Sequence, residues 1–224
     1  MFQYALILLI CLILSYLSGS VNFAILISKW AKGIDIRQAG NKNPGTSNVR
    51  REVGMGWAAL VFFGDLAKGL VPLILTKQFI FTDDVYTDIF SLFLIGMAAI
   101  TGHCWPIYHG FKGGGGLATS IGVYMFFVPA EFFLALLISF SVVRLFLSEK
   151  KYSVGQLTPM IFVPLAPVLV ILNSLFVEIK VTSDFIIGNY PWYIITGVIV
   201  LSLYIFMINI RIVANRFSKD NPNR

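Results

Sequence analysis

The sequence predicts an all-α protein, a polytopic membrane helix bundle that forms a single integral membrane domain over residues 1–224. Three observations lead to this prediction. The chain is 57% hydrophobic and 12% charged, whereas soluble domains contain about 25% charged residues. Long apolar segments recur along it, most of them near the roughly 20 residues that span a bilayer. Basic residues gather in a few connecting segments, as in the cytoplasmic loops of membrane proteins.

The apolar segments place the expected helices. They run over residues 4–28, 57–76, 89–108, 117–147, 154–172 and 191–210. No basic residue precedes Lys29, so a first membrane helix is favoured over a cleaved signal peptide. The segment 117–147 is too long for one ordinary span, and Val128-Pro129-Ala130-Glu131 is a turn near its middle. We therefore expect a hairpin of two short helices there, and about seven membrane helices in total.

The basic residues predict the orientation of these helices. Lys and Arg number six in residues 29–56, three in 144–152 and four in 211–224. Basic loops stay in the cytoplasm, so the N-terminus is expected outside and the C-terminus inside. The net charge of +6 fits such a protein with a basic cytoplasmic face that also contacts anionic lipids. The sequence offers no soluble basic domain for nucleic acid.

Two polar loops stand out against this apolar background. Residues 40–51, here called the polar island, combine small amides and glycines with two arginines. Gly113 to Gly116, here called the glycine loop, precede an expected helix start. Backbone N–H groups, amides and positive charge together favour a phosphate or another anion. The alternative to an anion site is a tight turn at Asn43-Pro44-Gly45 for the polar island and a flexible connector for the glycine loop. Both loops are expected on the cytoplasmic side, which predicts a membrane-embedded site for a cytoplasmic substrate.

A few polar residues lie inside the apolar segments. Asp65 and Lys68 are three residues apart, so on a helix they share a face and can pair. Charges within a span usually face a cavity or a partner, and a structural ion pair is as good an interpretation as chemistry. His103, a lone histidine before a helix break, is more often structural than catalytic. Asn209 either reaches a cytoplasm-facing cavity or makes an interhelical hydrogen bond.

These residues belong to an ordered series of motifs that covers nearly the whole chain. The series reads Gly19-Ser20; Asp35-Ile36-Arg37; Asn43, Gly45, Asn48-Val49 and Arg51; Asp65-x-x-Lys68-Gly69; Gly102-His103-x-x-Pro106; Phe111-Lys112-Gly113-Gly114-x-Gly116-x-Ala118-Thr119; and Asn209. In this series the chain resembles the bacterial acyl-phosphate:glycerol-3-phosphate acyltransferases, membrane enzymes of phospholipid biosynthesis. The resemblance implies a seven-helix bundle in the bacterial plasma (inner) membrane, which agrees with the count of apolar segments.

The resemblance also implies a reaction. A fatty acyl group moves from acyl-phosphate to the 1-hydroxyl of glycerol 3-phosphate, giving lysophosphatidic acid. The expected partners are these two substrates and membrane lipids, with no nucleic acid, no metal and no cofactor. The family reaction uses no enzyme nucleophile. Because acyl-phosphate is already activated, alignment and electrostatic stabilisation supply much of the rate.

Three positions depart from the usual family pattern. Asn41 stands where the family has serine, Gly115 where it has lysine, and Phe206 where it has histidine. A missing lysine removes a charged hydrogen bond of about 1.5–3 kcal/mol. Lys42, at a position usually occupied by glycine, and Lys112 are nearby charges that compensate for this loss.

The resemblance assigns the expected site residue by residue. The catalytic residues are Asn41, Arg51 and Asn209. The phosphate-binding residues are Lys42, Asn43, Gly45, Asn48, Lys112, Gly113, Gly114, Gly115, Gly116 and Thr119. A structural role, next to the residues that contact the substrates, is expected for Asp65, Lys68 and His103. Two hypotheses follow: an acyltransferase acting on glycerol 3-phosphate or a related phosphorylated acceptor, and a relative that binds or transports a lipid phosphate without acyl transfer.

Overall fold

The computed structural model describes residues 2–80, 85–147, 154–176 and 190–219, and these residues form helices and connecting turns without a strand. The predicted all-α class is therefore confirmed. The chain forms two compact units, Met1–Phe126 and Phe127–Arg224. Lys150 and Lys151, on which the predicted orientation partly depends, and most of the 173–190 segment lie outside the described residues.

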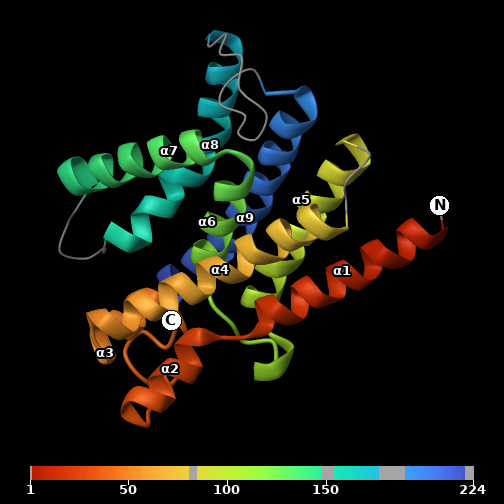
Figure 1. Ribbon diagram of the computed structural model, residues 1–224. Coiled ribbons are helices and arrows are strands. Elements are labelled where there is room, and N and C mark those ends of the chain that lie inside the picture. The colour runs from red at the N-terminus through yellow and green to blue at the C-terminus, as the bar shows by residue number, and fades with distance from the viewer. Residues whose placement is uncertain (1, 81–84, 148–153, 177–189, 220–224) are drawn as a thin grey trace. The chain divides into compact units, whose positions relative to one another are not determined.

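The first unit contains both polar loops and the long helices that they connect. Its elements are α1 (Phe2–Ser20), α2 (Phe23–Lys32), α3 (Thr46–Glu52), α4 (Met55–Phe79), α5 (Val85–Cys104), the 3₁₀ turn η1 (Ile107–His109) and α6 (Leu117–Phe127). Helix α1 lies along α5 (Figure 1). A Cβ atom added to Gly19 would lie 2.2 Å from the Ala99 carbonyl oxygen, and one added to Gly102 would lie 2.2 Å from that of Tyr16. Such small residues allow close backbone packing between membrane helices.

The second unit contains α7 (Pro129–Val142), the π-helical turn η2 (Val143–Leu147), α8 (Val154–Phe176) and α9 (Trp192–Lys219). Helix α8 packs against both α7 and α9. Phe132 and Phe162 meet edge to face, with ring centroids 5.4 Å apart. The buried Glu131 carboxylate accepts hydrogen bonds from Asn173 Nδ2 and, at 2.8 Å, from the Tyr190 hydroxyl. The unit is thus held by an apolar core and one buried polar cluster.

Five helical segments among the described residues are long and apolar enough to cross a membrane. They are Phe2–Lys32, Met55–Phe79, Asp88–His109, Pro129–Phe146 and Trp192–Ile210, with Leu117–Phe127 and Met160–Phe176 as shorter apolar helices. The expected break within 117–147 is confirmed, because α6 ends at Phe127 and α7 begins at Pro129. Proline suits a first helical position because its missing N–H has no helical partner there. The hairpin and the total of seven crossings stay predictions.

The N-terminal segment was expected to form one continuous helix over residues 4–28, and this expectation is wrong. The structure breaks it at Val21 and Asn22, between α1 and α2. The Asn22 side chain accepts the Ile25 N–H at 3.0 Å, and in an unbroken helix that N–H would bond the Val21 carbonyl. The Val21 carbonyl instead accepts a 2.6 Å hydrogen bond from Lys68 Nζ. The Asn22 amide and the Lys68 ammonium therefore replace the helical hydrogen bond between Ile25 and Val21. The hydropathy pattern does not reveal either replacement.

Candidate functional site

Asn48 organises the polar island. Its side chain is almost fully buried on α3. The amide nitrogen donates to the carbonyls of Ile36 at 3.2 Å and Ala39 at 2.9 Å, and the amide oxygen accepts the Asn41 N–H at 3.1 Å. Both N–H groups of this amide are therefore used inside the protein. Asn48, expected to bind phosphate directly, holds the backbone of residues 36–41 instead.

The turn of the polar island presents Lys42 outward on an unfavourable backbone. Lys42 has φ of +62°, and its side chain is exposed. The left-handed conformation costs a residue with a Cβ atom roughly 1–2 kcal/mol, and the glycine that the resemblance implies at this position would avoid that cost. Asn41 stabilises the turn, since its side-chain oxygen accepts the Asn43 N–H at 3.1 Å. Gly45 then precedes α3 as its N-terminal cap residue.

The glycine loop packs by its backbone against the C-terminal end of α5. The Gly113 N–H donates to the Cys104 carbonyl and the Gly114 N–H to the His103 carbonyl, both at 3.2 Å. A Cβ atom on Gly114 would lie 2.3 Å from His103 Nε2 and 3.0 Å from the Pro44 carbonyl oxygen. The two polar loops thus meet at Pro44 and Gly114.

The glycine loop is accordingly only partly available to an anion. Two of its four N–H groups, those of Gly113 and Gly114, are engaged with α5. Within the described part of the chain, the N–H groups of Gly115 and Gly116 make no backbone hydrogen bond outside a helix. They lie just before α6, whose N-terminus carries partial positive charge. A phosphate held by this loop would therefore contact its second half.

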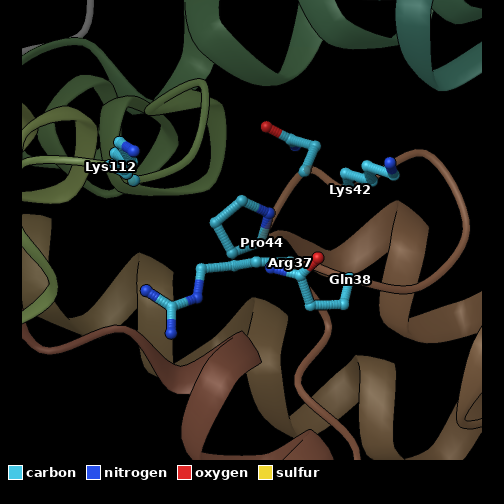
Figure 2. A pocket seen from close by; sticks show the side chains of 7 residues that line it. Arg37, Gln38, Lys42, Pro44 and Lys112 are labelled. Carbon is cyan, nitrogen blue, oxygen red and sulfur yellow. The ribbon is translucent and has the colours of Figure 1, made fainter.

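A pocket of about 380 Å³ lies where the two loops meet. It is lined by Arg37, Gln38, Lys42, Asn43, Pro44, Lys112 and Gly113. Figure 2 shows Lys42 and Lys112 on opposite sides of Pro44, each from its own loop. Both lysine side chains are exposed, and neither forms an ion pair within the described residues. The pocket therefore offers two ammonium groups to an anion.

The third cation of the pocket is already paired. Arg37 Nε lies 3.0 Å from Asp35 Oδ1, and Arg37 Nη2 lies 2.8 Å from Asp35 Oδ2. These hydrogen bonds from Arg37 lower the pKa of the Asp35 carboxyl and raise the pKa of the guanidinium. The pair fixes the direction of the arginine and cancels its charge. Three cations and one carboxylate leave the pocket with two positive charges, which suits a phosphate dianion.

The structure brings only part of the predicted site together. Lys42, Asn43, Lys112 and Gly113 share the pocket, whereas Arg51 lies exposed in the last turn of α3 and is not among the lining residues. Asn41 is likewise exposed and outside the lining. Thr119 is fully buried in α6, where its carbonyl oxygen would lie 2.1 Å from a Cβ on Gly69 of α4.

Asn209 and Phe206 belong to α9 in the second unit. The Asn209 side chain is half-buried, and its Nδ2 donates to the Ile205 carbonyl at 2.9 Å. Phe206 is 38% exposed. Asn209 is thus engaged with its own helix, and its expected catalytic role stays a prediction.

Sequence reasoning assigned no role to three of the lining residues. Arg37 stands within the Asp35-Ile36-Arg37 motif, where the two charges at i and i+2 were the available signal. In the sequence, Pro44 indicates only a turn. Gln38 carries no sequence signal for the pocket, because only the fold of the loop places it there.

A buried ionic cluster lies behind the glycine loop. Lys68 Nζ is 2.9 Å from Asp65 Oδ1, which confirms the predicted pairing on α4. His103 Nδ1 on α5 is 3.6 Å from the same carboxylate oxygen. All three side chains are at most 4% exposed. The cluster does not line the pocket, but the ring of His103 touches the loop that does.

Comparisons with known proteins agree with this architecture. The family model described as Glycerol-3-phosphate acyltransferase matches residues 9–216. A protein of that name from Halalkalibacterium halodurans is 46% identical over 121 residues, 54% of this chain and 57% of the relative. Another from Shouchella clausii is 41% identical over 157 residues, 70% of this chain and 73% of the relative. The matched stretch thus spans little more than half the length of the first relative.

Solved structures extend the similarity to almost the whole chain. The glycerol 3-phosphate form of PlsY (YgiH), an integral membrane glycerol 3-phosphate acyltransferase, has a TM-score of 0.71 and 29% identity, covering 95% of this chain and 92% of that one. Its lysophosphatidic acid form has a TM-score of 0.65 and 27% identity over the same shares. The match over residues 9–216 confirms the resemblance drawn from the motifs. The chain belongs to the glycerol-3-phosphate acyltransferase family of integral membrane proteins.

Proposed function

We propose that this protein transfers a fatty acyl group from acyl-phosphate to the 1-hydroxyl of glycerol 3-phosphate and so forms lysophosphatidic acid for phospholipid biosynthesis. Family membership supports the reaction class. The solved relative is described in forms with glycerol 3-phosphate and with lysophosphatidic acid, the acceptor and the product of this reaction. The observation that carries the proposal is the pocket lined by Lys42 and Lys112, neither of which has a carboxylate partner among the described residues.

The acceptor phosphate occupies this pocket in our proposal. Lys42 and Lys112 approach it from two sides, and each charged hydrogen bond contributes about 1.5–3 kcal/mol. Lys112 thereby supplies, from one end of the glycine loop, the charge that the resembled family usually places at position 115. Arg51 and Asn209 keep the catalytic roles that the resemblance implies.

The acyl-phosphate lies at the second half of the glycine loop in this proposal. The N–H groups of Gly115 and Gly116 and the N-terminus of α6 favour an anion there. The acceptor hydroxyl oxygen forms a bond to the acyl carbonyl carbon, and the bond from that carbon to the phosphate oxygen breaks. The departing phosphate keeps the electron pair and takes up the hydroxyl proton. The products are lysophosphatidic acid and inorganic phosphate, with no enzyme nucleophile.

The cellular setting is proposed from the basic segments. The site faces the cytoplasm of a bacterial inner membrane, with the N-terminus outside and the C-terminus inside. A cysteine placed at position 151 should react with a membrane-impermeant maleimide only after the cells are opened. Labelling of intact cells would contradict this orientation.

Turnover by the purified protein tests the reaction. Wild-type protein in lipid nanodiscs receives acyl-phosphate and glycerol 3-phosphate, and lysophosphatidic acid is measured by mass spectrometry. The double variant Lys42→Ala/Lys112→Ala should lose at least about 100-fold in kcat/KM, because two charged hydrogen bonds are removed. Lys29→Ala, an exposed lysine on α2 outside the pocket, is the matched control and should behave like wild type.

The same experiment separates the two hypotheses. Wild-type product no higher than in the double variant would refute acyl transfer from acyl-phosphate to glycerol 3-phosphate. Calorimetry with glycerol 3-phosphate on the same samples then reports whether the pocket still binds a phosphate. Binding without turnover would support the alternative, a relative that binds a phosphorylated ligand but has lost the chemistry through Asn41, Gly115 and Phe206.

A further inference from the structure

A line of buried polar contacts runs from the corner between α1 and α2 to the wall of the pocket. Lys68 Nζ donates to the Val21 carbonyl at 2.6 Å and pairs with Asp65 at 2.9 Å. Asp65 lies 3.6 Å from His103 Nδ1. The other ring nitrogen of His103 lies beside Gly114, since a Cβ there would be 2.3 Å from Nε2. The corner at Val21, α4 and α5 are thereby linked to the glycine loop.

The ring of His103 faces two partners at once. One edge faces Asp65, and the opposite edge faces Gly114. The backbone of His103 also holds the loop, because its carbonyl accepts the Gly114 N–H at 3.2 Å. On its other side, Gly114 is close to the carbonyl of Pro44, which lines the pocket. Gly114 is therefore packed between the imidazole and the polar island.

The burial of this cluster calls for a reason beyond pairing. Charges inside a membrane protein are costly, and a buried ion pair often contributes less than apolar side chains of the same size. Asp65 and Lys68 could satisfy one another without a histidine. The third member adds a rigid aromatic ring, with one edge 3.6 Å from a carboxylate oxygen and the other set against a glycine. Such an arrangement determines where the loop backbone lies.

We infer that His103, packed beside the Asp65–Lys68 ion pair, is a positioning residue that sets the distance between the glycine loop and Pro44 and thereby the width of the phosphate pocket. This inference rests on the proposed function of that pocket. His103 acts through Gly114 and does not line the pocket itself. A displacement of about 1 Å in a substrate-positioning group can reduce activity about 100-fold, so a small movement of Gly114 suffices for a measurable effect.

A size exchange between positions 103 and 114 tests the inference. His103→Asn keeps a polar group that can face Asp65 but removes Nε2 and Cε1, the ring atoms closest to a methyl group at 114. Gly114→Ala adds that methyl group. The four proteins of this cycle are compared in nanodiscs by the KM and kcat for glycerol 3-phosphate and by its Kd from calorimetry. The folded fraction is taken from size-exclusion profiles and thermal unfolding.

The expected pattern is specific to positioning. His103→Asn should raise the KM and Kd for glycerol 3-phosphate about threefold to tenfold, and Gly114→Ala should raise them more than tenfold. The double variant should return to within about threefold of His103→Asn, because the shortened side chain makes room for the methyl group. The kcat of the folded protein should change by less than about threefold throughout.

Two results from the variants would overturn the inference alone. One is His103→Asn with wild-type KM and Kd, and the other is a double variant no better than Gly114→Ala. A merely structural role for His103 would lower the folded fraction and leave the KM of the remaining enzyme unchanged. Calorimetry keeps this test independent of turnover. A wild-type protein that binds glycerol 3-phosphate but forms no product contradicts the proposed reaction alone, while absence of binding by wild type overturns both proposals.

Discussion

The polar island and the glycine loop line the same pocket but are built in opposite ways. The polar island is shaped by side chains, since the amides of Asn48 and Asn41 hold its backbone. The glycine loop is shaped by the lack of side chains, which lets Gly113 and Gly114 donate to carbonyls at the end of α5. The two loops that line the pocket thus owe their backbone shape to different causes.

The difference explains where each loop can vary. In the polar island, Lys42 is exposed, so a new side chain there projects away from the amides that hold the turn. In the glycine loop, a methyl group on Gly113 or Gly114 would overlap atoms of α5. Asn41 and Lys42, which both differ from the residues that the resemblance implies, fall at exposed positions of the polar island. We expect substitutions to have unequal effects on the two loops.

The largest effect should follow from a methyl group in the glycine loop. A Cβ on Gly113 would lie 2.0 Å from the His103 carbonyl oxygen and 2.8 Å from that of Cys104. Backbone atoms cannot turn aside as a flexible side chain can, so the loop must move. Gly113→Ala should lower kcat/KM for acyl transfer at least about 100-fold.

Gly56→Ala is the control for that substitution. Gly56 lies in α4, and a Cβ there would meet nothing within 4 Å. Alanine should stabilise the helix slightly, by up to about 1 kcal/mol, and leave turnover unchanged. Equal activities for the two alanine variants would show that the glycine loop does not depend on its missing side chains.

The next largest effect should follow from the loss of the amide that holds the polar island. Asn48→Ala removes three hydrogen bonds and leaves the Ile36 and Ala39 carbonyls without this donor. The free energy of unfolding should fall by about 2–4 kcal/mol, as measured by thermal or chemical unfolding in detergent. Ser47→Ala, one residue earlier on α3, should change it by less than about 0.5 kcal/mol. Similar losses for both variants would contradict the role assigned to the amide.

Lys42→Gly should move stability and binding in opposite directions. Glycine relieves the left-handed backbone at φ +62°, so the free energy of unfolding should rise by about 1 kcal/mol. The KM for glycerol 3-phosphate should rise about tenfold, because a charged hydrogen bond of about 1.5–3 kcal/mol is lost. Thermal unfolding and steady-state kinetics measure the two effects. A variant that is both more stable and fully active would remove Lys42 from the proposed site.

The smallest effect concerns pH. Because hydrogen bonds from Arg37 lower the pKa of Asp35, the contribution of this pair to stability is present above the unfolded-state pKa of about 3.9. It is lost as the pH falls through the lower folded-state pKa. The pair should therefore stay ionised at assay pH. The KM for glycerol 3-phosphate should rise only about fourfold between pH 7 and 5.5, as the phosphate itself protonates near pH 6. Asp35→Asn should leave the shape of this profile unchanged, and a change in shape would show that Asp35 titrates there.

Composition and motif order predicted much of this protein correctly. The apolar segments located the helices, and the proline at 129 located the break between α6 and α7. The spacing of Asp65 and Lys68 predicted their ion pair, because a helix places residues i and i+3 on one face. These predictions held because each depends on the local geometry of one helix.

What the sequence did not predict depends on contacts between distant segments. The corner at Val21 depends on Lys68, and the engaged N–H groups of the glycine loop depend on the end of α5. Asn48 was expected at a ligand because its residue type fits one, whereas the fold uses its amide to hold backbone. The sequence does not indicate whether the side-chain amide of an asparagine binds a ligand or the backbone of a loop.

The corner between α1 and α2 also has a consequence for the insertion of the chain into the membrane during synthesis. Its acceptor, the Val21 carbonyl, is synthesised 47 residues before its donor, Lys68. When the first apolar segment enters the membrane, that donor is still missing, and an unbroken helix leaves fewer backbone groups unsatisfied in lipid. We therefore expect the N-terminal segment to insert straight and to bend only after α4 arrives. Cysteine crosslinking between α1 and α2 in nascent chains that end before or after α4 would record the moment of bending.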